Sequence, residues 1–119
     1  LQVFIISIPM GALACAILAI NNLRDRAQDE IVGKKTLAVR LGDKGARGLY
    51  ITLLLSAHLF ALLTFEPSAL LTLLAAPLTW NLARGVISGV QGADLIPYLA
   101  KTGKLQLAFA LLFALGLII

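Results

Sequence analysis

Four long apolar stretches constrain this chain more than any other feature of its sequence. They cover residues 1–20, 49–65, 69–90 and 105–119, with approximate ends. A helix needs ~20 residues to cross the hydrocarbon core of a bilayer, and each stretch meets or approaches that length. Backbone amides cannot stay unpaired in lipid, so these stretches are predicted to be helices rather than strands. The sequence therefore predicts an all-α, polytopic bundle of four transmembrane spans.

The composition supports a membrane protein. Hydrophobic residues make up 60% of the chain and charged residues 13%, whereas soluble domains average about 45–50% and about 25%. The chain opens at Leu1 and stops at Ile119 inside apolar runs, so we expect it to be a segment of a longer protein. The net charge of +4 is concentrated in the connections. This distribution favours membrane orientation and anionic ligands over nucleic acid.

Basic residues fall on alternate connections between the spans. The connection at Glu66 and Pro67 has none, whereas the one that follows the third span carries Arg84, Lys101 and Lys104. The connection between the first two spans carries Arg24, Arg26, Lys34, Lys35, Arg40, Lys44 and Arg47. Because basic connections stay in the cytoplasm, we expect a multi-pass protein of the inner (cytoplasmic) membrane. Segment 21–47 is then a cytoplasmic loop.

A polar block directly follows the first apolar stretch. If it continues that span as a helix, Asn21, Asp25 and Asp29 recur every four residues and share one face. Mg²⁺ is typically held by one or two carboxylates together with phosphate oxygens, so this face suits a metal–phosphate site. The alternative is a solvated loop whose charges serve only topology. The spacing alone does not decide between the two.

The wording of this block, NNLRDRAQDEIVGKKTLAVRLG at residues 21–42, closely resembles the second aspartate-rich motif of the UbiA superfamily of membrane prenyltransferases. Its Asn-Asn-x-Arg-Asp start is most similar to the branch that prenylates 1,4-dihydroxy-2-naphthoate in menaquinone biosynthesis. The resemblance covers nearly the whole chain. It implies nine transmembrane helices around a central cavity, and the spans here are the last four. Residues 1–119 are then the C-terminal portion of a single prenyltransferase domain.

The resemblance also implies a reaction and a site. A polyprenyl group passes from a polyprenyl diphosphate to 1,4-dihydroxy-2-naphthoate, with loss of carbon dioxide and pyrophosphate, giving demethylmenaquinone. Asp25 and Asp29 are implied as catalytic residues that bind Mg²⁺. The residues implied to bind the diphosphate are Asn21, Asn22, Arg24, Lys34, Lys35 and Arg40. The first aspartate-rich motif of the family has no match in this chain, so we expect the segment alone to be inactive.

Other functions stay open at this point. The same family includes enzymes whose acceptor is 4-hydroxybenzoate, homogentisate or a porphyrin. A transporter or channel fragment could line an ion pathway with Asp25 and Asp29, but such sites usually lie near the bilayer midplane rather than at the end of a span. A structural membrane subunit could use the polar block to dock a partner. Binding of a prenyl diphosphate that depends on Mg²⁺ would separate an enzyme from the last two.

Three further residues have simple structural interpretations. His58 lies midway along the second span and is predicted to make a hydrogen bond that packs two helices together. Thr36 is predicted to be the N-cap of the helix that follows it. Gly33 either ends a helix or lets the chain turn close to phosphate.

Overall fold

The computed structural model describes residues 2–63 and 67–118. Within these ranges every regular element is a helix, and no strand is present. The elements in chain order are α1 (Gln2–Arg24), α2 (Arg26–Ile31), α3 (Leu37–Leu62), the 3₁₀-helix η1 (Pro67–Ala75), α4 (Ala76–Ile87), the 3₁₀-helix η2 (Gly92–Leu95) and α5 (Ile96–Ile118).

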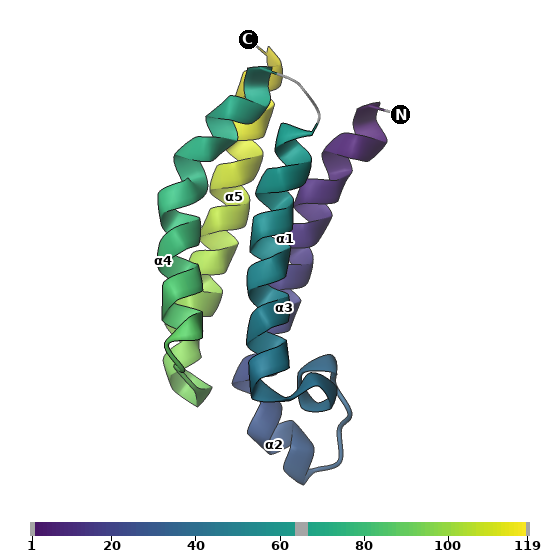
Figure 1. Ribbon diagram of the computed structural model, residues 1–119, viewed down its shortest axis with the longest axis vertical. Coiled ribbons are helices and arrows are strands. Elements are labelled where there is room, and N and C mark those ends of the chain that lie inside the picture. The colour runs from purple at the N-terminus through teal and green to yellow at the C-terminus, as the bar shows by residue number, and fades with distance from the viewer. Residues whose placement is uncertain (1, 64–66, 119) are drawn as a thin grey trace.

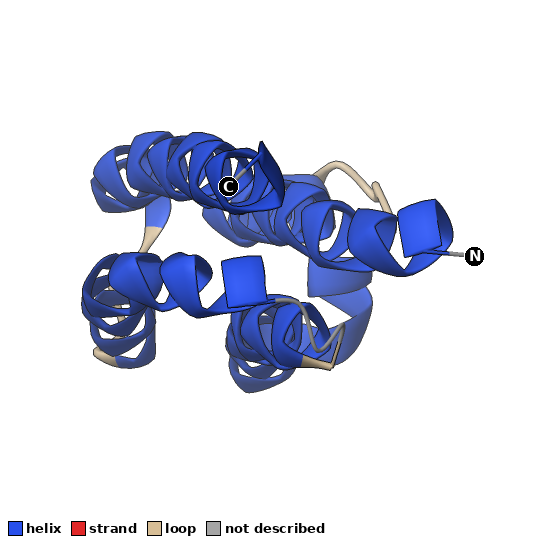
Figure 2. Cartoon of the chain, turned by 90° about the horizontal axis from the view of Figure 1, so that it is seen from above, coloured by secondary structure: helices blue, strands red, loops and turns tan. Residues whose placement is uncertain are grey.

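The long helices run side by side as an up-and-down bundle, with α2 projecting from one end (Figure 1). Seen along the bundle, the helix that starts the chain and the helix that ends it lie in one layer, above α3 and α4 in the other (Figure 2). Four helical segments are long and apolar enough to cross a membrane. They are Ser7–Arg24, Leu37–Leu62, Leu70–Ile87 and Gly92–Gly116. The predicted bundle of four apolar helices is therefore confirmed.

The core follows helical spacing on each of these segments. On α1, for example, Leu13, Ala16 and Ile20 are fully buried. The outer surface is also apolar, since Leu18 is 59% exposed and Leu111 62% exposed. A helix that is apolar on both its inner and its outer face suits a lipid environment. This is why hydropathy reveals the length of each span but not which face packs inward.

The helices extend beyond the apolar stretches at the polar end of the bundle. Segment 21–47, expected as a loop, is largely helical, because α1 continues to Arg24 and α3 begins at Leu37. α3 is kinked at Gly42, which has φ 77° and ψ 176°. Glycine adopts this conformation without steric cost, so the first turn of α3 can stand at an angle to the rest.

The sequence predicts one continuous helix over residues 69–90 for the third span. In the structure this span is divided between a 3₁₀-helix and an α-helix. Its first half is η1, and the α-helical half begins at Ala76. Pro77 lies in the first turn of α4, where a missing backbone N–H costs no hydrogen bond. The α-helix ends at Ile87, and Gly89 follows with φ 100°. Part of the predicted turn at 66–68 lies outside the described residues.

Candidate functional site

The polar block continues the helical path of α1 with one break. Asp25 lies between α1 and α2 with φ −94° and ψ 3°. Its backbone N–H donates to the carbonyl oxygen of Asn21 at 3.3 Å, and the N–H of Asp29 donates to the carbonyl of Asp25 at 2.8 Å. Hydrogen bonds from each residue to the fourth before it therefore cross the break. Asn21, Asp25 and Asp29 stay one helical turn apart, as the sequence predicts.

The acidic residues face away from the core of the four helices. Leu23, only 4% exposed, marks the inward face of α1 at this level. Asp25 follows two residues later, which is more than half a turn around a helix of 3.6 residues per turn. Both Asp25 and Asp29 are half-buried. Neither carboxylate is thus enclosed by the described helices, and both can be reached by a ligand.

Asp25 is held by its neighbour Arg24 in a two-point ion pair. Nε of Arg24 donates to Oδ1 of Asp25 at 3.0 Å, and Nη2 donates to Oδ2 at 3.1 Å. This hydrogen bonding lowers the pKa of the Asp25 carboxyl; partial burial opposes the shift, and the charges of Arg24 and Lys34 reinforce it. Asp25 is therefore ionised and fixed in orientation, and both a guanidinium and an ammonium lie close to it.

The end of α2 brings Lys34 back beside Asp29. Gly33 has φ 80°, its N–H donates to the carbonyl of Glu30 at 3.3 Å, and the N–H of Lys34 donates to the carbonyl of Asp29 at 2.8 Å. This pair of bonds is the Schellman pattern that closes helices at glycine, so the helix-ending interpretation of Gly33 is confirmed. The Asp29 carboxylate has no ion-pair partner within the described residues. Of Asp25 and Asp29, Asp29 is therefore the one whose carboxylate is not already paired with a cation in the described part of the chain.

The remaining predicted phosphate ligands are spread along the surface. Lys34, Lys35 and Arg40 have exposed side chains. Thr36 caps α3, since its Oγ1 accepts from the N–H of Val39 at 3.3 Å, which confirms the predicted N-cap. No ion pair joins Lys35 or Arg40 to Asp25 or Asp29 in the described part of the chain. The structure thus groups Arg24 and Lys34 with the two acids and leaves Lys35 and Arg40 as exposed cations.

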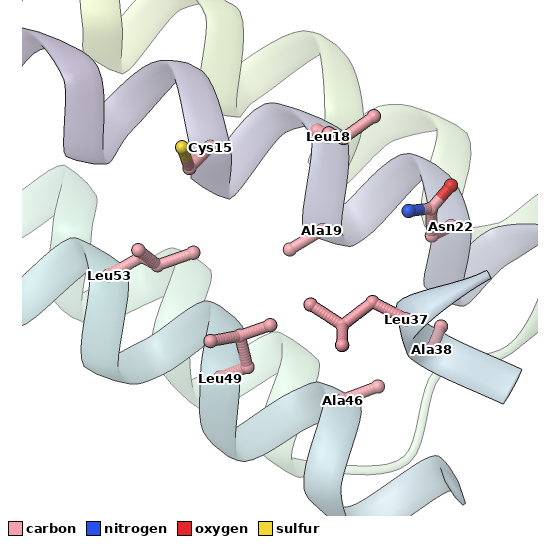
Figure 3. Close-up of a pocket in the computed structure, with 9 residues that line it drawn as sticks. All are labelled: Cys15, Leu18, Ala19, Asn22, Leu37, Ala38, Ala46, Leu49 and Leu53. Atoms are coloured by element: carbon pink, nitrogen blue, oxygen red, sulfur yellow. The ribbon is translucent and has the colours of Figure 1, made fainter. Parts of the chain in front are cut away.

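Asn22 points to a different place, an apolar cavity of about 280 Å³ between α1 and α3. Cys15 and Leu53 lie at one end of this cavity, and Asn22 and Leu37 lie at the other (Figure 3). Asn22 is the amide among otherwise apolar lining residues. The cavity therefore suits an apolar chain that ends in a polar group near the polar block.

A second cavity, of about 210 Å³, is polar and contains a residue whose role the sequence did not reveal. Arg47 is only 6% exposed and lines it together with Arg24 and Arg26. Nε of Arg47 donates to Oδ2 of Asp43 at 2.9 Å. From the sequence alone Arg47 is only one of the cations of the loop; its spacing of four residues from Asp43 was the available signal.

The donor groups fit a metal that is shared with phosphate. Within the described residues, no cluster of three or more His, Cys, Asp or Glu side chains could enclose an ion. Asp25 and Asp29 nevertheless offer two carboxylates at one end of a helix. Mg²⁺ is commonly held by one or two carboxylates plus phosphate oxygens and water. The site thus fits Mg²⁺ that arrives with a diphosphate better than a metal bound by protein alone.

Comparison with known proteins identifies a family for this chain. The model of the UbiA prenyltransferase family matches residues 1–94. The chain is 44% identical to a 1,4-dihydroxy-2-naphthoate octaprenyltransferase of Mycobacterium tuberculosis, over 91% of this chain and 38% of that protein. It is 42% identical to the Escherichia coli protein of the same name, over 90% of this chain and 36% of that protein. No solved structure matches the chain.

A human relative is more distant. It is named UbiA prenyltransferase domain-containing protein 1 and is 34% identical, over 95% of this chain and 33% of its own length. The chain thus spans little more than a third of the length of the curated relatives it matches. Its helical architecture and the match over residues 1–94 agree. The chain belongs to the UbiA prenyltransferase family.

Proposed function

We infer that the protein containing this chain transfers a polyprenyl group from a polyprenyl diphosphate to 1,4-dihydroxy-2-naphthoate. Carbon dioxide and pyrophosphate are released, and the product is demethylmenaquinone. The observation that carries this proposal is the pairing of Asp25 and Asp29 at the end of an apolar helix, with Arg24 and Lys34 beside them. The names of the relatives above support the choice of naphthoate as acceptor.

Each residue of the site has a distinct task in this proposal. The carboxylates of Asp25 and Asp29 hold Mg²⁺, which when bound stabilises negative charge on the pyrophosphate leaving group. Arg24 fixes the orientation of Asp25 through its two hydrogen bonds. Lys34 neutralises diphosphate oxygens as a point charge. Asn21, Lys35 and Arg40 extend the polar surface for the diphosphate.

The apolar cavity between α1 and α3 is a suitable place for part of the polyprenyl chain. Its walls are apolar, and Asn22 lies at the end nearest the polar block. A diphosphate at the acids and an isoprenoid tail along this groove would satisfy both parts of the donor.

The proposed location is the inner membrane, with the polar block in the cytoplasm. The polar end of the bundle carries Arg24, Arg26, Lys34 and Lys35. Positive residues near span ends are retained on the cytoplasmic side. The diphosphate donor would then be bound from the cytoplasmic side of the bilayer.

The test uses the full-length protein in membranes, supplied with a polyprenyl diphosphate and Mg²⁺. Prenylated, decarboxylated naphthoate is the expected product. Asp25→Ala and Asp29→Ala are each expected to reduce turnover at least 100-fold, a loss of roughly 2.7 kcal/mol of transition-state stabilisation. Asp94→Ala is the matched control because Asp94 is exposed and lies in η2. It should leave the rate unchanged.

Two outcomes would change the proposal. Product from 4-hydroxybenzoate alone would retain the reaction type and replace the acceptor. Normal turnover of both Asp25→Ala and Asp29→Ala would remove the two acids from the metal site. Membrane insertion of each variant should be checked by protease accessibility, so that lost activity is not confused with lost folding.

A further inference from the structure

A cationic surface lies at the polar end of α4 and α5, apart from the aspartate pair. It consists of Arg84, Lys101 and Lys104, all exposed. None of the three forms an ion pair within the described residues, whereas Arg24, Arg26 and Arg47 each pair with a carboxylate. Between residues 76 and 104 the only acid is Asp94, so three cations and one acid leave a net charge of +2.

The contact between α4 and α5 holds this cationic surface together. A Cβ atom at Gly85 would overlap the ring of Tyr98, so the ring rests directly on the α4 backbone at that glycine. Nζ of Lys101 lies 5.7 Å from the centroid of the same ring. A cation over an aromatic face is attracted to it. The Lys101 ammonium is thereby held beside α4, close to the helical turn that carries Arg84.

Exposed apolar side chains continue from the cationic surface toward the middle of the bundle. Trp80 is 64% exposed and precedes Arg84 by one helical turn on the same face. Leu107 and Leu111, each 62% exposed, follow Lys104 by three and seven residues. Tryptophan and cations at this relative depth are typical of a helix end at the membrane–water interface. The surface is therefore charged at the polar end of the bundle and apolar toward its middle.

We propose that this surface binds an anionic phospholipid. Arg84 and Lys101 contact the lipid phosphate, Lys104 adds a further charge, and the acyl chains lie along Trp80, Leu107 and Leu111. A zwitterionic lipid is the poorer partner because its headgroup carries no net charge to match the +2 of the surface. The assignment concerns the outer face of α4 and α5 and does not depend on the proposed prenyl transfer.

The test compares binding of phosphatidylglycerol and phosphatidylcholine to the full-length protein by native mass spectrometry from nanodiscs. Each cation near an anionic lipid surface contributes about fivefold in affinity. The double variant Arg84→Gln/Lys101→Gln is therefore expected to lose about 30-fold in phosphatidylglycerol affinity. Lys44→Gln removes an exposed charge at the same end of the bundle, at the start of α3, and should retain the wild-type preference.

Several results would overturn the assignment. Phosphatidylglycerol preference that survives in the double variant would show that these two cations do not bind it. An equal loss in Lys44→Gln would indicate a diffuse charge effect without a site. Displacement of the lipid by millimolar glycerol phosphate would identify a site for free phosphate. Arg84→Lys/Lys101→Arg keeps both charges and should bind within threefold of wild type; a 30-fold loss in that variant would contradict the role of charge.

Discussion

Arg47 donates from Nη1 to the carbonyl oxygen of Val86 at 2.5 Å, so a buried guanidinium on α3 caps the C-terminal end of α4. Its Nη2 also donates to the carbonyl of Val90 at 2.7 Å, and Asp43 neutralises its charge. The last carbonyls of a helix have no partners within the helix and carry partial negative charge. One side chain therefore joins two spans at the point where the chain leaves α4 for η2, next to the polar end of α1.

Replacing Arg47 should destabilise the bundle. In Arg47→Met the carbonyls of Val86 and Val90 lose the guanidinium as a donor, while the Val86 carbonyl still accepts from the N–H of Gly89 at 3.4 Å. A hydrogen bond to a charged group contributes about 1.5–3 kcal/mol. We expect the free energy of unfolding of the full-length protein to fall by about 2–4 kcal/mol. The measurement is denaturant unfolding in mixed micelles.

Two companion variants make this test specific. Lys44→Met changes an exposed side chain three residues away, which should alter the free energy of unfolding by less than about 0.5 kcal/mol. Arg47→Lys keeps the charge but cannot contact two carbonyls and a carboxylate at once. Its free energy of unfolding should therefore lie between those of Arg47→Met and Lys44→Met. Wild-type stability in Arg47→Met would show that the three hydrogen bonds contribute little.

The close approach of α4 and α5 at Gly85 gives a second prediction. In Gly85→Ala the added methyl group would overlap the ring of Tyr98, so the helices must shift or the ring must move. Overpacking of this kind costs typically about 1–3 kcal/mol. Gly103→Ala is the matched control, since a Cβ there meets nothing within 4 Å and Gly103 lies within α5.

The two alanine variants should differ in melting temperature. Alanine is favoured over glycine in a helix by up to about 1 kcal/mol, so Gly103→Ala should leave the melting temperature unchanged or raise it. Gly85→Ala should lower it by several degrees. Equal melting temperatures would show that Tyr98 can leave Gly85 without cost.

The fold was largely predictable from the sequence because a membrane span must be both long and apolar. The starts of α3 and α5 were not predictable. These helices begin at Leu37 and Ile96, several residues before the apolar stretches. Helical hydrogen bonding continues into polar sequence, where hydropathy gives no signal. The 3₁₀ form of η1 also left no signal, because the two helix types place the same apolar residues in a span.

The site was predictable only in its local parts. The hydrogen bond expected for His58 is confirmed, as its Nε2 lies 2.8 Å from Oγ1 of Thr79 on α4. The ion pair of Arg24 with Asp25 was not expected, since adjacent residues in a regular helix do not face each other. It forms at the break in the helix. The partners of Arg47 lie 39 and 43 residues away, beyond any local pattern.

A third prediction concerns the contact between α3 and α5. Tyr50 is fully buried, and its hydroxyl lies 2.6 Å from Oγ1 of Thr102. Thr102 donates to the carbonyl of Tyr98 at 2.7 Å, so Tyr50 is the donor to Thr102. Tyr50→Phe should lower the free energy of unfolding by about 0.5–1.5 kcal/mol.

Tyr98→Phe is the control for this hydrogen bond. The Tyr98 hydroxyl makes no hydrogen bond within the described residues, and its ring stays in place against Gly85. Loss of the Tyr98 hydroxyl should therefore change the free energy of unfolding by less than about 0.5 kcal/mol. Equal destabilisation by the two variants would mean that lost polarity in general, and not the Tyr50–Thr102 bond, is responsible.

The last prediction is the pH dependence of the Asp25 carboxyl. Its hydrogen bonds from Arg24 place its pKa below the ordinary value of 3.8 in the folded protein. A lowered pKa stabilises the fold above the unfolded-state pKa, and this contribution is lost as the pH falls through the folded-state pKa. In Arg24→Gln the pKa should rise toward its ordinary value, with Lys34 still opposing part of the rise. Carbon NMR titration of Asp25 in the full-length protein should show protonation at higher pH in Arg24→Gln than in wild type or Lys44→Gln. Superimposable titration curves for all three would show that Arg24 does not control the ionisation of Asp25.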